Sequence, residues 1–389
     1  LGAGGVGKTT IAAALGVAAA RAGFSTGVLT VDPARRLRDA LGIARLEAHP
    51  RPLEARRLRA AGLDARLALA AASLDVKATW DGMVERFVPR PGARRQILQS
   101  SFYRNLTDRF AGAEAYAAVE QLLTMHERQS FAIEVVDTPP AQQAFDFVEA
   151  PEHLARLLDS RAARWLLHWT AQSGRNRAPL SNRLARLVVA QIENFAGARP
   201  LSAIAEFFAA AAESTDAIRA RMLEAGALIH SPAVNFVLVT TAEKYRLDGA
   251  RAIARQIKSA RLRLAAVVIN RVADERHFEA LSQTPERIPA YLREAAAVQA
   301  LASTDRRLNP IARFFGDYVA AQSAAIGQAA RFAREISSRI SLTAVPEIGR
   351  DTNELRWLAK VADTLIGENN GRQFLEQSAR ALAAETARK

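Results

Sequence analysis

The first ten residues contain a phosphate-binding loop, which constrains the fold more than any other feature of the sequence. Residues 2–10 read G-A-G-G-V-G-K-T-T and match the pattern G-x-x-x-x-G-K-[ST]. Glycines let successive backbone N–H groups turn inward and approach phosphate oxygens. In such a loop Lys8 bridges the β- and γ-phosphates, the Thr9 hydroxyl ligates Mg²⁺, and the following helix points its N-terminus at the anion. The residues predicted to hold a nucleotide are Gly4, Gly5, Val6, Gly7, Lys8, Thr9 and Thr10.

Strand and helix signals alternate after this loop. Residues 8–22 are rich in alanine and read as a helix that ends at Gly23. Gly27–Val31 is a short apolar run with β-branched residues, and Asp32 followed by Pro33 stops it. A strand, a helix and a second strand at this spacing predict a βαβ unit with parallel strands.

Three later apolar runs read as further strands of a parallel sheet. They are residues 132–136, 236–241 and 265–270, and the last two flank a predicted helix at about 247–259. Each run ends at or just before a polar residue, including Asp137 and Asn270. Ligands of open α/β sheets bind at the edge where these carboxyl ends meet. The sequence therefore predicts a ligand site at that edge.

Long helical stretches separate these strands, at about 75–129, 141–228 and 289–341. We therefore predict an α/β protein of the P-loop NTPase class, with a mostly parallel, doubly wound sheet and a helical subdomain inserted between strands. A loop of this kind normally follows a buried strand, and Leu1 directly precedes the loop here, so we expect that strand to be truncated. The predicted division is an ATPase core at 1–50, 130–150 and 232–350, a helical subdomain at 75–129 and 151–230, and C-terminal helices at 351–389.

The amino-acid composition excludes several kinds of functional site. The chain has no cysteine, which excludes disulfides, thiolate zinc sites and cysteine nucleophiles. No apolar stretch approaches the roughly 18–20 residues that span a bilayer. Lys and Arg number 53 against 40 Asp and Glu, a formal charge of +13 that attracts anions, although the basic residues form no dense run.

A dinucleotide-binding site is one alternative for the glycine loop. Gly2, Gly4 and Gly7 fit the spacing G-x-G-x-x-G, and Asp32 follows the next strand, where a carboxylate would bind a ribose. This interpretation leaves Lys8 and Thr9 without a role, so we disfavour it.

A GTPase is a second alternative, since small GTPases carry similar loops. They also need D-x-x-G and N-K-x-D motifs. Here Asp137 is followed by Thr138-Pro139-Pro140, and Asn270 is followed by Arg271-Val272-Ala273, so the residues that read guanine are missing.

The combined motifs resemble the arsenite-translocating ATPase family, which has a deviant Walker A loop and includes the guided-entry ATPases that target tail-anchored membrane proteins. The chain is most similar to bacterial-type members. Four motifs carry the resemblance in the family's order, with a weaker fifth. They are Gly2–Thr10, Asp32-Pro33-Ala34-x-x-Leu37, Asp137-Thr138-Pro139-Pro140, Val267-Val268-Ile269-Asn270 and Val345-Pro346-Glu347.

The resemblance implies a role for each matched residue and implies ATP and Mg²⁺ as cofactors. Asp32 would position the attacking water and act in catalysis with Lys8. Asp137 would hold Mg²⁺ through water, beside the Thr9 hydroxyl. Asn270 would bond the adenine edge, and Pro346 would lie near the base.

The resemblance also implies a dimer, with one departure. The family carries a lysine at the position of Ala3, and that lysine reaches the partner's nucleotide across the dimer interface. Without it we expect weak hydrolysis by this chain alone. A heterodimer with a lysine-bearing paralogue would supply the missing cation. A homodimer would instead need a substitute cation, such as Arg35 or Arg36.

The client and the cellular role stay open at this point. The leading expectation is a cytoplasmic ATPase whose helical subdomain binds a hydrophobic helix or a partner protein, with transient membrane association left open. Leu154, Leu157, Leu158 and Leu166 lie at helical spacings and suggest either an apolar groove or an internal core. A partitioning-type ATPase that binds DNA or membrane non-specifically is the alternative. The charge favours it, but the long apolar helices make DNA the less expected partner. A regulatory ATPase that hydrolyses poorly is a third class.

Overall fold

A computed structural model gives the fold, and its described residues cover most of the chain. Asp32, Arg35 and Leu166, which the sequence singles out, lie outside them. The described residues are 1–31, 36–109, 112–128, 130–160, 207, 210–272, 321, 324–336, 340–348 and 353–366.

The first sheet has four strands in the order β2-β3-β1-β4. Their bounds are β1 Thr26–Thr30, β2 Arg51–Pro52, β3 Leu69–Ser73 and β4 Ile133–Asp137. β1 runs parallel to both β3 and β4, and the short β2 is antiparallel to β3. The register places Thr30 beside Asp137, so the carboxyl ends of β1 and β4 meet at one edge.

The second sheet is entirely parallel, with the order β5-β6-β7. Its strands are β5 Phe236–Thr241, β6 Leu264–Val272 and β7 Ser341–Pro346. Leu1 runs alongside β5, because its backbone nitrogen donates to the Val237 carbonyl at 2.7 Å and its carbonyl accepts from the Val239 N–H at 2.8 Å. The phosphate loop therefore starts at the edge of this second sheet.

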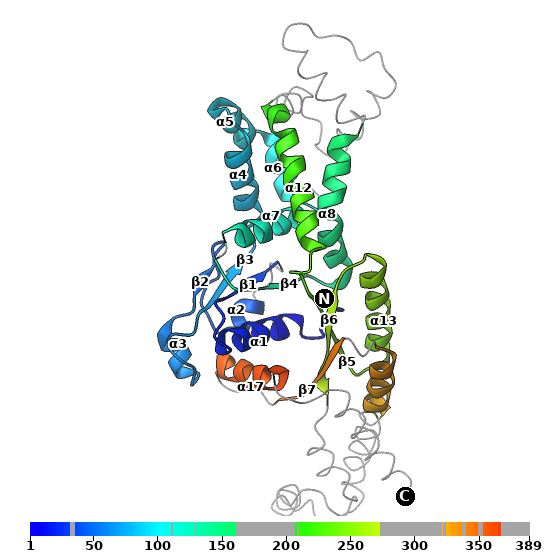
Figure 1. Cartoon of the computed structure of the whole chain (residues 1–389). Helices are drawn as coiled ribbons and strands as arrows, with labels where there is room; N and C mark the ends of the chain where they lie inside the picture. The colour runs from blue at the N-terminus through cyan, green and yellow to red at the C-terminus, as the bar shows by residue number, and fades with distance from the viewer. Residues whose placement is uncertain are drawn as a thin grey trace, which may run out of the picture.

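Helices cover the sheets and complete the core. α1, Lys8–Arg21, packs on β1 and β4 through a buried face that includes Ile11 and Val17. α17, Glu354–Ile366, lies against the other side of α1 (Figure 1), and it also contacts α2, Arg36–Ala40, and α3, Ala55–Ala60. α13, Lys244–Ser259, packs on β5 and β6. The first part of the predicted C-terminal helical segment is thus packed onto the core.

A group of helices stands on the opposite side of the sheets from α1 and α17 (Figure 1). They come from the chain between β3 and β4 and between β4 and β5, where the sequence placed a helical subdomain; the subdomain division itself stays a prediction. Their bounds are α4 Val76–Phe87, α5 Pro91–Gln99, α6 Ser101–Arg109, α7 Ala113–Glu127, α8 Ala141–Asp159, the 3₁₀ turn Ala212–Ser214 and α12 Thr215–Ile229. Asp75 caps α4 by accepting the Ala78 N–H at 2.9 Å, and Pro91 opens α5.

A buried ion network joins two of these helices. Arg221 of α12 is 3% exposed and makes a two-pronged contact with Glu120 of α7, with Nε to Oε2 at 2.8 Å and Nη2 to Oε1 at 3.0 Å. Its Nη1 also donates to Glu127, and its Nη2 donates to the Thr124 hydroxyl at 3.2 Å. This network fixes the register of α12 on α7.

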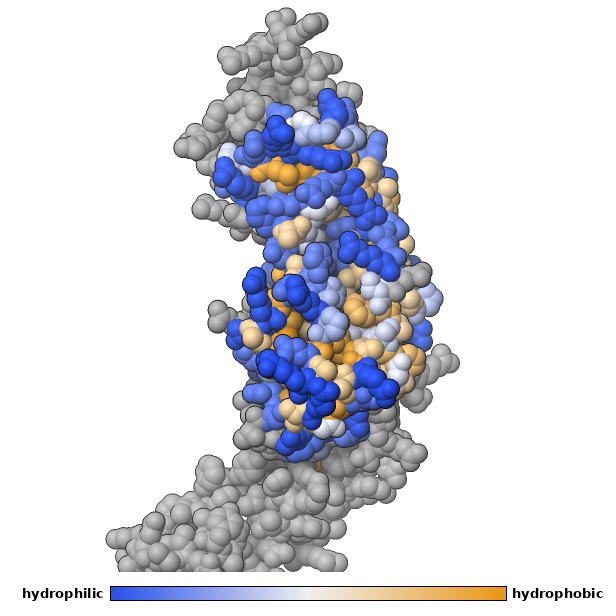
Figure 2. All heavy atoms as spheres, turned by 90° about the vertical axis from the view of Figure 1, so that its left-hand side faces the viewer, coloured by the Kyte–Doolittle hydropathy of each residue, from blue (hydrophilic) through white to orange (hydrophobic). Residues whose placement is uncertain are grey.

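The surface is mixed in character. Figure 2 shows one face on which hydrophilic residues are spread widely and apolar residues gather in smaller patches, over both the helical part and the sheets. Among the described residues, no helix combines the length and the apolar character needed to cross a membrane.

Candidate functional site

The phosphate loop has the backbone shape that its glycines predict. Gly5 and Gly7 have φ angles of 80° and 92°, in the left-handed region where side chains are strained. A Cβ on Gly7 would also collide with the Asn270 Nδ2 atom. Position 7 therefore needs glycine for two independent reasons.

The N-terminus of α1 is open toward this loop. Gly7 is the N-cap residue, no side chain caps the helix, and the first turn has no acidic residue. The first N–H groups of a helix lack intrahelical partners and carry partial positive charge, which favours an anion. Lys8 folds back over the loop and donates from Nζ to the Ala3 carbonyl at 3.0 Å. The loop, the helix end and the lysine together form a site suited to phosphate.

Asp137 is the buried last residue of β4. The Thr30 hydroxyl donates to its Oδ2 at 3.1 Å, and the Val31 N–H donates to its carbonyl at 3.0 Å. These bonds hold the carboxylate at the edge where ligands of open sheets bind. Among the described residues there is no cluster of three or more His, Asp or Glu side chains that could hold a metal alone. A carboxylate and a hydroxyl, Asp137 and Thr9, nevertheless suit Mg²⁺, which keeps several waters and shares phosphate oxygens.

Asn270 lies directly on the phosphate loop. Its buried side chain donates from Nδ2 to the Val6 carbonyl at 2.9 Å. Arg271, the next residue, has a φ of 55°, and the pairing of β6 with β7 shifts register across this point. Pro346 pairs with Val272 just beyond the shift. The ends of β6 and β7 therefore meet beside the loop, while the predicted roles of Asn270 and Pro346 toward adenine stay predictions.

One contact to the loop was missed by the sequence analysis. Arg246, in the first turn of α13, donates from Nη1 to the Gly4 carbonyl at 2.6 Å. A basic residue just after the carboxyl end of β5 was the available signal. Spacing alone did not indicate that this side chain reaches a loop 242 residues earlier in the chain.

Comparison with protein families decides the assignment. The family model described as anion-transporting ATPase matches residues 1–294, about three quarters of the chain. The chain belongs to the anion-transporting ATPase family. No curated protein matches it.

Membership confirms two predictions made from the sequence. The predicted family is correct, and the parallel sheets with their covering helices agree with the P-loop NTPase fold of this ATPase family. Membership in this ATPase family also agrees with our rejection of the dinucleotide-binding and GTPase interpretations. The catalytic assignment of Asp32 concerns a residue outside the described part of the chain.

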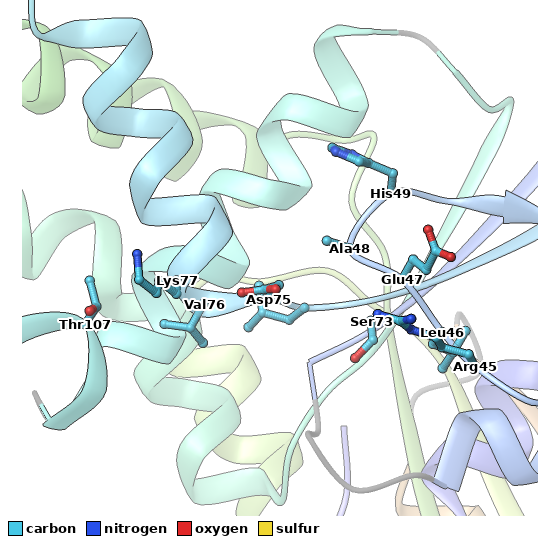
Figure 3. Close-up of a pocket in the computed structure, with 11 residues that line it drawn as sticks. Arg45, Leu46, Glu47, Ala48, His49, Ser73, Asp75, Val76, Lys77 and Thr107 are labelled. Carbon is cyan, nitrogen blue, oxygen red and sulfur yellow. The ribbon is translucent and has the colours of Figure 1, made fainter. Parts of the chain in front are cut away.

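A hollow lies at the carboxyl end of β3. It has a volume of about 750 Å³ and separates residues 45–49 from the start of α4 and from Thr107 (Figure 3). Its charged residues are of both signs, and two of them form ion pairs: Glu47 with Arg51 at 2.6 Å, and Lys77 with Asp81 at 2.6 Å. The Leu74 N–H donates to the Thr30 carbonyl at 2.9 Å, so this cleft is close to the end of β1.

Proposed function

We propose that the protein binds MgATP and hydrolyses it, and that nucleotide state controls its association with a second subunit and a client. The open N-terminus of α1, with Lys8 folded over the glycine loop, is the observation that carries this proposal. Asp137, held at the same edge of the sheet by Thr30, supports it.

In this mechanism the chain acts mainly by placing charge. The loop N–H groups and Lys8 bind the phosphates and stabilise the negative charge that develops on the transferred phosphoryl group. Thr9 and Asp137 would hold Mg²⁺, which neutralises part of the same charge. Asp32 would orient the attacking water, in keeping with its match to the family motif. Phosphoryl transfer needs this positioning more than it needs a strong base.

Replacing Lys8 tests the binding step. Lys8→Ala removes a charge-assisted contact worth about 2–4 kcal/mol, so we expect MgATP affinity to fall by about 30- to 1000-fold. Lys258→Ala is the matched control, because Lys258 is an exposed lysine near the end of α13. Affinity is measured by isothermal titration, with thermal melting to confirm folding. An unchanged affinity in a folded Lys8→Ala protein refutes the phosphate site, and a preference for GTP refutes the adenine role of Asn270.

Dimerisation and client binding form the second part of the proposal. Ala3 favours a heterodimer with a lysine-bearing paralogue over a homodimer with full activity. Native mass determination with ATP, with ADP and without nucleotide, after purification with partners retained, tests this. A nucleotide-independent monomer contradicts it.

A hydrophobic client would need an exposed apolar face on the helical part. Leu154 packs against the main core cluster, Leu158 is half-buried, and Leu157 is 53% exposed, so the predicted leucine face is divided between core and surface. Leu223 of α12 is also exposed. We propose that this surface of α8 and α12 contributes to client binding. A nucleotide-independent affinity for an apolar helical peptide would argue against it.

The +13 charge favours one other candidate, non-specific DNA binding by an ATP-bound form. Retention on DNA that rises with ATP and falls steeply with salt would support this candidate over the client-binding ATPase.

A further inference from the structure

Arg246 lies against the phosphate loop from a distant part of the chain. Its Nη1 donates to the Gly4 carbonyl at 2.6 Å. Its Nη2 would be 3.6 Å from a Cβ built on Gly5. The guanidinium group therefore covers the two consecutive glycines in the middle of the loop.

The first turn of α13 holds Arg246 in this place. The Arg246 N–H donates to the Glu243 carbonyl at 2.9 Å, and its carbonyl accepts from the Thr240 hydroxyl of β5 at 3.2 Å. Its guanidinium carbon lies 4.8 Å from the centre of the Tyr245 ring, within the range of a cation–π contact. The backbone of Arg246 is thus anchored to a buried strand, and its side chain is supported by an aromatic ring.

Among the described residues, no carboxylate forms an ion pair with Arg246. Arg251 of the same helix, in contrast, binds both Glu335 and Asp248. One hydrogen bond to a carbonyl uses one of the five N–H donors of a guanidinium group, and the planar fork matches phosphate oxygens. Lys8 contacts the Ala3 carbonyl in the same way. Two consecutive loop carbonyls therefore each accept from a cation.

We propose that Arg246 is a second phosphate-binding cation of this loop, and that its guanidinium group contacts the terminal phosphate of a bound nucleoside triphosphate. This inference rests on the proposed ATPase function and adds to it the discrimination of triphosphate from diphosphate. An arginine that stabilises the transferred phosphoryl group raises the rate of other P-loop enzymes by factors of about 10³–10⁵. Ala3 supplies no charge to the loop, and Arg246 is a cation that the structure brings to the neighbouring residue.

The test compares three replacements of Arg246 in the full chain. Arg246→Gln keeps a donor for the Gly4 carbonyl but removes the charge, Arg246→Lys keeps the charge, and Arg246→Ala removes both. We expect the Gln and Ala variants to lose at least about 100-fold in kcat, with ADP affinity changed less than about threefold, and the Lys variant to keep a measurable part of the rate. Arg255→Ala, an exposed arginine of the same helix, should leave rate and affinity unchanged.

The outcomes separate this inference from the proposed function. If Arg246→Gln turns over like the wild type while Lys8→Ala loses nucleotide, the site is an ATPase site and the role of Arg246 is refuted. If Arg246→Ala lowers rate and ADP affinity together and Arg246→Gln restores both, Arg246 only shapes the loop, which also refutes it. If the wild type binds no MgATP, both proposals fail.

Discussion

Replacing Arg221 with methionine tests how strongly the helical part depends on its buried ion network. Burial opposes the charge on Arg221, but hydrogen bonds to Glu120 and Glu127 outweigh it and raise the pKa of the guanidinium above its ordinary value. Methionine fills a similar volume without the charge. It leaves the Glu120 side chain, which is 5% exposed, without its cation.

The expected loss follows from that stranded carboxylate. Removing one partner of a buried ion pair destabilises a protein by about 3–5 kcal/mol, because the remaining charge is buried and uncompensated. Arg219→Met is the matched control on the same helix. Arg219 pairs with Asp159 at 2.8 Å, but the two side chains are 40% and 54% exposed. Exposed pairs contribute about 0–1 kcal/mol, so the control should unfold almost like the wild type.

Urea unfolding followed by circular dichroism measures both variants, with the slopes compared to confirm a common unfolding reaction. The double variant Arg221→Met/Glu120→Leu removes both charges and should recover most of the lost stability. If Arg221→Met falls within 1 kcal/mol of Arg219→Met, or if the double variant is less stable than the single one, the buried-charge reasoning is wrong.

Two further predictions concern Gly7 and Glu134. Gly7→Ala places a side chain on a left-handed backbone and against Asn270, so it should lower the free energy of unfolding by more than about 1–2 kcal/mol. Gly4→Ala is the control, because a Cβ on Gly4 meets nothing within 4 Å. Thermal melting of both variants without nucleotide measures the difference. Burial raises the pKa of Glu134 to about 7, so the stability it contributes is full below pH 4.5 and is lost as pH rises through 7. Glu134→Gln should remove this pH dependence and raise the free energy of unfolding at pH 8 by about 1–2 kcal/mol, after allowance for solvent screening. The measurement is the melting temperature of the wild type and the variant as a function of pH. Parallel pH profiles for the two proteins would contradict the assignment.

The strands that flank the site were predictable because their residues favour strands. Residues 132–136 and 236–241 are rich in apolar residues with β-branched members, and the structure places β4 and β5 within one residue of them. β3 was missed because Leu69–Ser73 reads L-A-A-A-S, which has no β-branched residue and suits a helix equally well. It forms a strand because β1 pairs along its whole length and buries it. Pairing with β1, rather than local sequence preference, therefore makes this segment a strand.

The site itself was predictable where a motif is local and unpredictable where contacts are distant. The glycine loop and the helix after it follow from consecutive residues. Asn270 was predicted near the nucleotide, but its bond to Val6 and its collision with any side chain at position 7 depend on how two sheets meet. Arg246 reaches Gly4 through the same meeting of the sheets. No periodicity in the sequence encodes that arrangement.

The loop connects parts of the chain that are synthesised far apart in time. Leu1 bonds to β5, Val6 bonds to Asn270, and α1 packs on β1 and β4. A ribosome that has released the chain only as far as residue 230 has exposed the whole glycine motif but none of the second sheet. We expect the emerging chain to gain phosphate binding late, after residue 270 has left the exit tunnel. Contacts of such long sequence separation fold slowly. Cellular nucleotide, by binding only the completed loop, would then favour the finished fold over partly folded chains.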